Sequence, residues 1–295
     1  MPNTYGYDVD RSRALDTIRA MFDGPPAVID TSRNYGVGRS EERLGAVISE
    51  RGGMPEGFVL STKLDRDADT GRFDARQARQ SLEESLTALT VDRVDVLHLH
   101  DPEHSRDLAE IAGKGGALEE LFQMKSEGLA DSVGLAMGRV DMMFPLLREF
   151  PFDALINHNR FTLLNREAEE MYDFAHANGI RVWNAAPYAG GVLAKGSAKA
   201  ERVTYQVADE EALRPVKAVE EVCARFGIAP GAAALQFSMK DPRVETTIVG
   251  VSKPERVAQT LEWANADIPD EAWAALGELS YSTEDPEASR TYEHD

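Results

Sequence analysis

The sequence is poor in cysteine and has no long apolar segment. Its 295 residues contain one cysteine, Cys223, which excludes an internal disulfide and is typical of a reducing compartment. No apolar run approaches the roughly 20 residues that a membrane-spanning helix needs. The first 13 residues lack the apolar core of a signal peptide. We therefore expect a cytoplasmic protein with no membrane association.

Basic residues are also scarce relative to acidic ones. Lys and Arg number 32 against 51 Asp and Glu, which gives a formal net charge of −19. Nucleic acids and anionic membranes would be repelled by this charge, so neither is an expected partner. The 42% of apolar residues excludes a disordered chain. The composition does not indicate the oligomeric state of the protein.

Short β-rich runs alternate with amphipathic helical patterns along the whole chain. The strand candidates are residues 27–32, 59–64, 94–100, 130–137, 152–159, 180–187 and 246–252. Strands separated by helices predict right-handed βαβ units and a parallel sheet. Seven such repeats without a linker predict one α/β domain over residues 1–295, a (β/α)8 TIM barrel. No GxGxxG fingerprint follows a strand, which argues against a Rossmann fold.

Further predictions concern the two ends of the chain and the longest connection, which lies between the last two strand candidates. A barrel needs eight strands, and only residues 3–7 precede the first helical pattern, so we expect a short or irregular first strand. Two helices are predicted at roughly 208–226 and 230–239. The polar C-terminal tail, about 280–295, either frays or covers one face of the barrel, and fraying is expected for a terminus.

Titratable residues gather at the ends of three consecutive strands. Asp30, Lys63 and His100 each lie at or close to the C-terminal end of a strand candidate, and Tyr35 lies in the Gly-rich loop after Asp30. The active site of a parallel barrel forms at the carboxyl ends of its strands. We therefore expect these four side chains to meet at one rim.

The stretch DTSRNYGVGRSEERLG (30–45) resembles the signature of the aldo-keto reductase superfamily, which reads Asp-Thr-Ala, then Tyr-Gly, then Ser-Glu and Leu-Gly at this spacing. STK (61–63), DVLHLHDP (95–102) and PYAGGVL (187–193) are similar to further family segments, in the same order. The resemblance implies a (β/α)8 barrel, a nicotinamide dinucleotide and reversible carbonyl–alcohol chemistry. The aldose and pyridoxal dehydrogenase branch looks nearest, which suggests a carbonyl or sugar substrate, such as an aldose oxidised to a lactone.

The family's catalytic tetrad falls on Asp30, Tyr35, Lys63 and His100. Hydride transfer to a carbonyl builds negative charge on oxygen, which requires a proton donor. A tyrosine hydroxyl titrates near pH 10, and a neighbouring ammonium group favours its phenolate form. The resemblance therefore implies that Tyr35 is the general acid or base, Lys63 tunes it, Asp30 positions Lys63 and His100 orients the carbonyl.

The cofactor is expected at the loops after the last two strand candidates, where barrels often bind phosphate. Ser252 can cap the following helix and Pro254 suits its first turn. Arg256 favours NADP, whereas Gly250, where relatives often have Lys, leaves NAD as the alternative. Gly190 and Gly191 would let the backbone approach the pyrophosphate. The candidate cofactor-binding residues are His158, Pro187, Gly191, Leu193, Gly250, Ser252, Lys253, Arg256 and Gln259.

The expected nicotinamide pocket departs from the family pattern. Ala136 and Met137 stand where relatives commonly have Ser-Asn, and His158 stands where a Gln is usual. Ala185 replaces an aromatic residue that stacks on the ring, and Tyr188 and Trp183 are the candidate substitutes. Trp183, Tyr5 and the C-terminal tail are also candidates for the substrate site. These departures concern cofactor affinity and leave the tetrad intact.

Two alternatives compete with this interpretation. His98 and His100 have the His-x-His spacing of a metal-dependent TIM-barrel hydrolase, but the last strand candidate carries no acid, so we expect no metal and a packed His98. A non-catalytic cofactor-binding subunit is the second alternative, favoured by the altered nicotinamide pocket and opposed by the intact tetrad.

Overall fold

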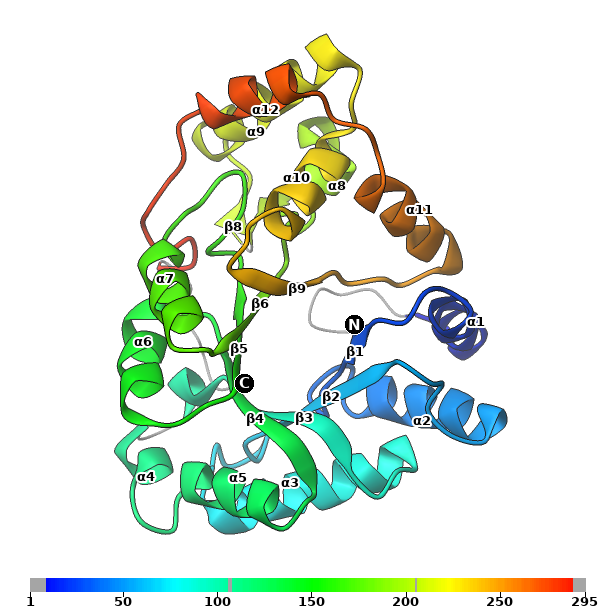
Figure 1. Ribbon diagram of the computed structural model, residues 1–295, viewed down its shortest axis with the longest axis vertical. Helices are drawn as coiled ribbons and strands as arrows, with labels where there is room; N and C mark the ends of the chain where they lie inside the picture. Colours follow the sequence, from blue (N-terminus) through cyan, green and yellow to red (C-terminus); the bar gives the residue numbers. More distant parts are fainter. Residues whose placement is uncertain (1–8, 106–107, 205, 289–295) are drawn as a thin grey trace.

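The computed structural model describes residues 9–105, 108–204 and 206–288, which form a parallel α/β barrel (Figure 1). Seven parallel strands lie in the order β1-β2-β3-β4-β5-β6-β9. They are β1 (Val28–Asp30), β2 (Val59–Leu64), β3 (Val94–His100), β4 (Ala130–Met137), β5 (Ala154–His158), β6 (Arg181–Ala185) and β9 (Val244–Ile248). The expected α/β barrel is confirmed.

Helices surround this sheet in Figure 1. They are α1 (Arg11–Phe22), α2 (Arg39–Arg51), α3 (Ala75–Leu89), α4 (Leu108–Ala112), α5 (Ala117–Ser126), α6 (Val140–Glu149), α7 (Glu169–Ala177), α8 (Val192–Lys195), α9 (Glu210–Phe226), α10 (Pro230–Met239), α11 (Pro254–Ala264) and α12 (Asp270–Gly277). Two 3-10 turns, Pro102–His104 and Ser197–Lys199, and a hairpin of β7 (Arg202–Val203) with β8 (Gln206–Val207) complete the described part. No helix among the described residues is long and apolar enough to cross a membrane.

Side-chain alternation along the strands separates two apolar layers. In β3, Leu97 and Leu99 pack into the large cluster between sheet and helices. Val96 packs into a smaller cluster inside the barrel with Ile156 and Trp183. Successive strand residues point to opposite faces, so His98 and His100 share the inward face with Val96.

Most predicted element boundaries agree with the structure. The strands predicted at 59–64, 94–100 and 130–137 have these bounds, and α9 and α10 match the predicted helices to within two residues. The last strand was predicted at 246–252 but runs from Val244 to Ile248. Its partner β6 ends at Ala185, which pairs with Ile248, so the chain beyond Ile248 has no strand to bind.

The two predictions about the chain ends have different outcomes. The first strand expected at 3–7 lies outside the described residues. Among the described strands, β1 pairs only with β2 and β9 only with β6. Fraying of the tail is wrong for residues 280–288, because Ser282 forms a bridge with Asn165 and its N–H donates to Leu164 O (2.9 Å).

Candidate active site

The four strand-end residues predicted from the sequence lie together at the carboxyl end of the barrel. Asp30, Lys63 and His100 come from β1, β2 and β3, and Tyr35 comes from the loop between β1 and α2. All four line one cleft of about 1910 Å³. The parallel sheet brings them together because it aligns the carboxyl ends of neighbouring strands.

A buried ion pair forms the base of the cleft. Lys63 Nζ lies 2.6 Å from Asp30 Oδ2 and donates to Thr31 O at 2.7 Å. Ser61 Oγ donates to the other Asp30 oxygen at 3.0 Å. The Lys63 side chain is only 1% exposed, and a buried ammonium requires such partners. The pair therefore holds one positive charge at a fixed point of the cleft wall.

The ring of Tyr35 lies between this ammonium group and an imidazole. Lys63 Nζ is 4.6 Å from the centre of the Tyr35 ring. The His100 ring is 5.6 Å away, centre to centre, and nearly perpendicular at 84°. Gly38 closes the loop with φ +82°, a left-handed backbone conformation that favours glycine. The compact loop thus fixes Tyr35 over Lys63.

His100 has a carboxylate beside each ring nitrogen. Its Nδ1 lies 2.5 Å from Asp65 Oδ1, and its Nε2 lies 3.6 Å from Asp101 Oδ2. Burial lowers the pKa of His100, but the charges of Asp101 and Asp65 and the hydrogen bond to Asp65 outweigh burial, so the pKa lies above its usual value. The sequence analysis missed Asp65, although an acid directly after the strand at 59–64 was a usable signal.

His98 is packed in the core of the barrel, as predicted. It is fully buried, and its ring lies 5.3 Å from that of Trp183. Gly134 faces it, and a Cβ at that position would lie 2.4 Å from His98 Cδ2. Burial keeps the pKa of His98 well below its usual value, so it is neutral. The described residues contain no group of three or more potential ligands that could hold a metal ion.

The cofactor candidates separate into those that line the cleft and those that do not. The lining ones are His158, Gly191, Gly250, Ser252, Arg256 and Gln259. Leu193 packs instead into an apolar cluster with Val216 and Val219. Pro187 is buried, and Lys253 is exposed. Six of the nine therefore line the cleft, and four of these, Gly250, Ser252, Arg256 and Gln259, belong to the segment around the start of α11.

The start of α11 differs from the expected cap. Its N-cap is Lys253, one residue after the expected Ser252, and no side chain caps it. Pro254 occupies the first turn as predicted. In the same helix, the Arg256 guanidinium donates to Oε1 of the Gln259 side-chain amide. Pro254 has no N–H and the Arg256 N–H donates to Lys253 O at 3.0 Å, so the uncapped helix start offers an anionic ligand its dipole more than a set of free donors.

The two neighbouring glycines after β6, Gly190 and Gly191, have different surroundings. A Cβ at Gly190 (φ +71°) would lie 2.0 Å from Thr204 O, so Gly190 admits the backbone of the β7–β8 hairpin. At Gly191 (φ +96°), the nearest atoms to a Cβ belong to the flexible Lys195 side chain, at 3.8 Å. The expected close approach to a pyrophosphate is thus open to Gly191 only.

Positive charge collects at this end of the cleft. Lys195, Lys199 and Arg202 line it together with Arg256. The first three were not predicted from the sequence, because the elements that carry them, α8, the 3-10 turn Ser197–Lys199 and the hairpin, were not predicted. In a chain of net charge −19, this local concentration suits a polyanionic ligand. The end of the cleft therefore fits the phosphates of a dinucleotide.

The aromatic candidates for the nicotinamide pocket do not behave alike. Trp183 is 1% exposed inside the barrel, and its Nε1 donates to Glu245 at 3.2 Å, so it cannot stack on a ligand. Tyr188 lines the cleft and packs edge-on against Trp263, 5.8 Å between ring centres. Ala136, Met137 and Ala185 also line the cleft. Tyr5 lies outside the described residues.

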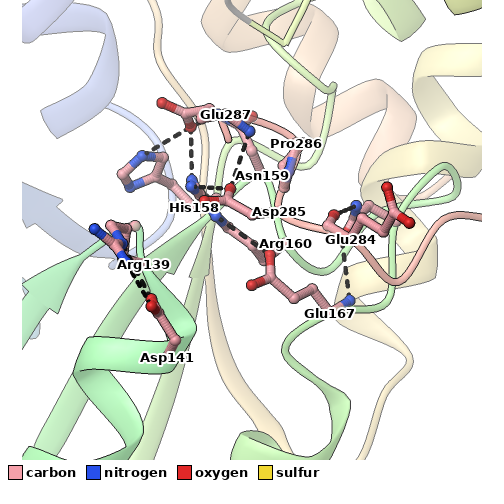
Figure 2. Close-up of polar contacts among 12 residues, drawn as sticks. Arg139, Asp141, His158, Asn159, Arg160, Glu167, Glu284, Asp285, Pro286 and Glu287 are labelled. Atoms are coloured by element: carbon pink, nitrogen blue, oxygen red, sulfur yellow. Dashed lines mark hydrogen bonds and ion pairs between the residues drawn. The ribbon is translucent and has the colours of Figure 1, made fainter. Parts of the chain in front are cut away.

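Residues 282–288, here named the C-terminal strap, pack beside the end of β5 (Figure 2). The fully buried Arg160 anchors them: its Nη2 donates to Asp285 Oδ1 at 2.5 Å and its Nη1 to Glu287 Oε1 at 2.6 Å. Glu167 lies on the other side, 3.6 Å from Arg160 Nε. Burial, together with the charge of Asp285, raises the pKa of Glu167 to about 7. One guanidinium thus binds three carboxylates.

The strap also contacts the cleft wall. Glu287 Oε1 lies 3.3 Å from His158 Nε2 and accepts a hydrogen bond from Asn159 Nδ2 at 3.3 Å (Figure 2). The side chain of Glu287 is fully buried. Because His158 lines the cleft, the strap supports one side of the site.

Comparison with known proteins places this geometry in context. The sequence model of the aldo/keto reductase family matches residues 3–280. A D-threo-aldose 1-dehydrogenase from Pseudomonas sp. is 30% identical over 90% of this chain and 87% of its own length. A pyridoxal 4-dehydrogenase from Microbacterium luteolum is 24% identical over 91% and 88%. The holo form of an aldo-keto reductase from Bacillus halodurans has a TM-score of 0.76, 18% identity, and coverage of 96% and 92%.

Proposed function

Since the chain belongs to the aldo/keto reductase family, we propose that it transfers hydride reversibly between NADP and an aldehyde, ketone or aldose. Tyr35 is the general acid in reduction and the general base in oxidation. The family supports a nicotinamide-dependent oxidoreductase; the preference for NADP over NAD and the residue roles are parts of this proposal. We further propose that the chain works as one barrel domain in the cytoplasm.

The observation that carries the proposal is the Asp30–Lys63 pair under the Tyr35 ring. The Lys63 ammonium, fixed 2.6 Å from Asp30 and 4.6 Å from the ring centre, stabilises a phenolate electrostatically. Tyr35 can therefore release its proton to a carbonyl oxygen as negative charge develops there, and recover a proton from an alcohol in the reverse direction. His100 lies beside the ring and can donate a hydrogen bond to the same oxygen.

The bound nicotinamide would supply or accept the hydride. The residues at the other end of the cleft fit its phosphates: the uncapped start of α11 offers the positive end of the helix dipole, and Lys195, Lys199, Arg202 and Arg256 offer charge. A Cβ at Gly250 would meet no atom within 4 Å, so the chain leaves open space there. His158 is the remaining candidate partner of the carboxamide.

The substrate class follows the relatives by analogy. The two dehydrogenases named above act, by their names, on an aldose and on pyridoxal. Oxidation of a cyclic aldose to its lactone is therefore the reaction we propose to test first. It requires removal of one hydroxyl proton, for which Tyr35 is placed, and transfer of the anomeric hydride to the nicotinamide.

The decisive experiment is a fluorescence titration with NADPH and NADH, followed by turnover with a panel of aldoses and small aldehydes in both directions. Binding of one dinucleotide and turnover of at least one substrate are expected. Failure to bind either dinucleotide would overturn the proposal. Binding without turnover would identify a non-catalytic subunit, and stoichiometric zinc in the purified protein would favour a hydrolase.

Cofactor choice gives a separate prediction about Arg256. Arg256→Ala should raise the Kd of NADPH by about tenfold, because one charge-assisted contact to the 2′-phosphate is lost. The Kd of NADH should hardly change, because NADH has no 2′-phosphate. Lys253→Ala is the matched control, since Lys253 is exposed beside the same helix. An equal loss of affinity for both dinucleotides would contradict the assignment.

A further inference from the structure

We infer that Asp65 is a positioning residue for His100: it fixes the proton on Nδ1 and keeps a cationic donor at Nε2, facing the reacting oxygen. The inference rests on the proposed function, because it concerns the oxygen that Tyr35 protonates. Asp65 touches neither the substrate site nor Tyr35 in any described contact. It would act on the reaction only through the imidazole.

The carboxylate of Asp65 is fixed by its surroundings. It is a buried residue, 3% exposed, directly after β2. Its Oδ2 accepts hydrogen bonds from Ser32 Oγ at 2.7 Å and from Asn34 N at 3.0 Å. Its own N–H donates to Ser81 Oγ at 2.9 Å. These contacts leave Oδ1 directed at His100 Nδ1, 2.5 Å away.

This arrangement determines where the imidazole carries its protons. An ionised carboxylate can only accept hydrogen bonds, so Nδ1 must be the donor. A neutral His100 would then present only a lone pair at Nε2. To donate a hydrogen bond to a carbonyl or alcohol oxygen, His100 must be protonated on both nitrogens. The positive charge so formed faces the oxygen on which negative charge develops during reduction.

Taken together, the charged groups around His100 favour the imidazolium form, which is protonated on both nitrogens. Burial lowers the pKa of His100, but Asp101 and Asp65 raise it by more, while the ammonium of Lys63 opposes them. The charges of His158, His104 and Arg66 are in turn among those that lower the pKa of Asp101. Removing the Asp65 charge takes away one of the two carboxylates that favour the imidazolium. The pKa of His100 must therefore fall.

The test is the pH dependence of reductive kcat/KM in Asp65→Asn. Activity should decline as pH rises through the pKa of His100, and the variant should show this decline about one pH unit lower. At a pH on the declining limb, kcat/KM should fall by about tenfold, a loss typical of a removed supporting carboxylate. The Kd of NADPH should stay unchanged, because the cofactor end of the cleft is untouched.

Two variants control this measurement. Asp95→Asn makes the same substitution in β3, where the carboxylate accepts from Leu60 N at 2.7 Å, far along the strand from His100; its pH profile should match the wild type. Ser32→Ala keeps the Asp65 charge and removes the hydrogen bond from Ser32 Oγ to Asp65 together with the 3.3 Å contact of Ser32 Oγ with His100 Nδ1, so its profile should move much less than that of Asp65→Asn. An equal shift in Asp95→Asn would overturn the inference.

An NMR titration of the His100 ring, assigned by comparison with His100→Gln, separates this inference from the proposed function. In the wild type, the His100 midpoint should coincide with the kinetic limb, and in Asp65→Asn both should move down together. If neither moves, or only the resonance moves, Asp65 has no positioning role. If no carbonyl substrate turns over, the proposed function fails, while the titration still reports on the Asp65–His100 pair.

Discussion

Tyr35→Phe should lower kcat by about a thousandfold in both directions, within the range that a lost general acid costs. The substitution removes only the phenol oxygen. The phenyl ring can remain over Lys63 Nζ, 4.6 Å from its centre, so the shape of the cleft is preserved. The Kd of NADPH should therefore hardly change. Steady-state turnover together with a fluorescence titration measures both quantities on one preparation.

The control is Tyr172→Phe. Tyr172 is a fully buried residue of α7 and donates to Asn184 Oδ1 at 3.0 Å, and it does not line the cleft. This variant loses the same atom at a place where no chemistry is proposed, so its kcat should match the wild type even though its stability falls. Unchanged turnover in Tyr35→Phe would refute Tyr35 as the acid and base.

Arg160→Met should cost about 3–5 kcal/mol in the free energy of unfolding at neutral pH, the usual loss when one partner of a buried ion pair is removed. Three carboxylates face the Arg160 guanidinium, and that of Glu287 is fully buried. Without the guanidinium, the fully buried Glu287 carboxylate would lose its charged hydrogen-bond donor and lie beside Asp285 and Glu167, whose side chains are 23% and 16% exposed. Urea unfolding followed by circular dichroism measures the loss.

Arg148→Met is the matched control for that measurement. Arg148 also faces a carboxylate, Glu170, but at 3.7 Å with both side chains more than half exposed. Exposed ion pairs contribute about 1 kcal/mol or less, so this variant should stay within that limit. Similar losses for the two variants would show that the strap contributes no more stability than an ordinary surface contact.

Much of the fold and the centre of the site could be predicted because local pattern and topology both act there. Asp30, Lys63 and His100 end three consecutive apolar runs, and parallel strands must present their ends together. The length of a strand depends on its partner, which explains the error at 246–252: Ile248 is the last residue with a partner in β6. That dependence is not visible in the local sequence.

The cofactor end was predicted less well because loop geometry decides it. Leu193 belongs to the same PYAGGVL segment as Gly191, yet it turns into the apolar cluster when α8 begins at Val192. Gly190 looked equivalent to Gly191, but the hairpin backbone at Thr204 occupies its space. The contacts of Arg160 join residues more than a hundred positions apart, and no local pattern announces them.

The C-terminal strap also sets the order in which the molecule can be completed. The guanidinium of Arg160 is buried only because Asp285 and Glu287, 125 and 127 positions later, reach it. During synthesis the chain emerges from its amino end, so β5 and Arg160 leave the ribosome long before their partners exist. Until Asp285 and Glu287 have been synthesised, the Arg160 guanidinium must stay hydrated and the strap cannot yet support His158. This wall of the site can therefore be completed only after residues 285–287 have been synthesised, late relative to β5.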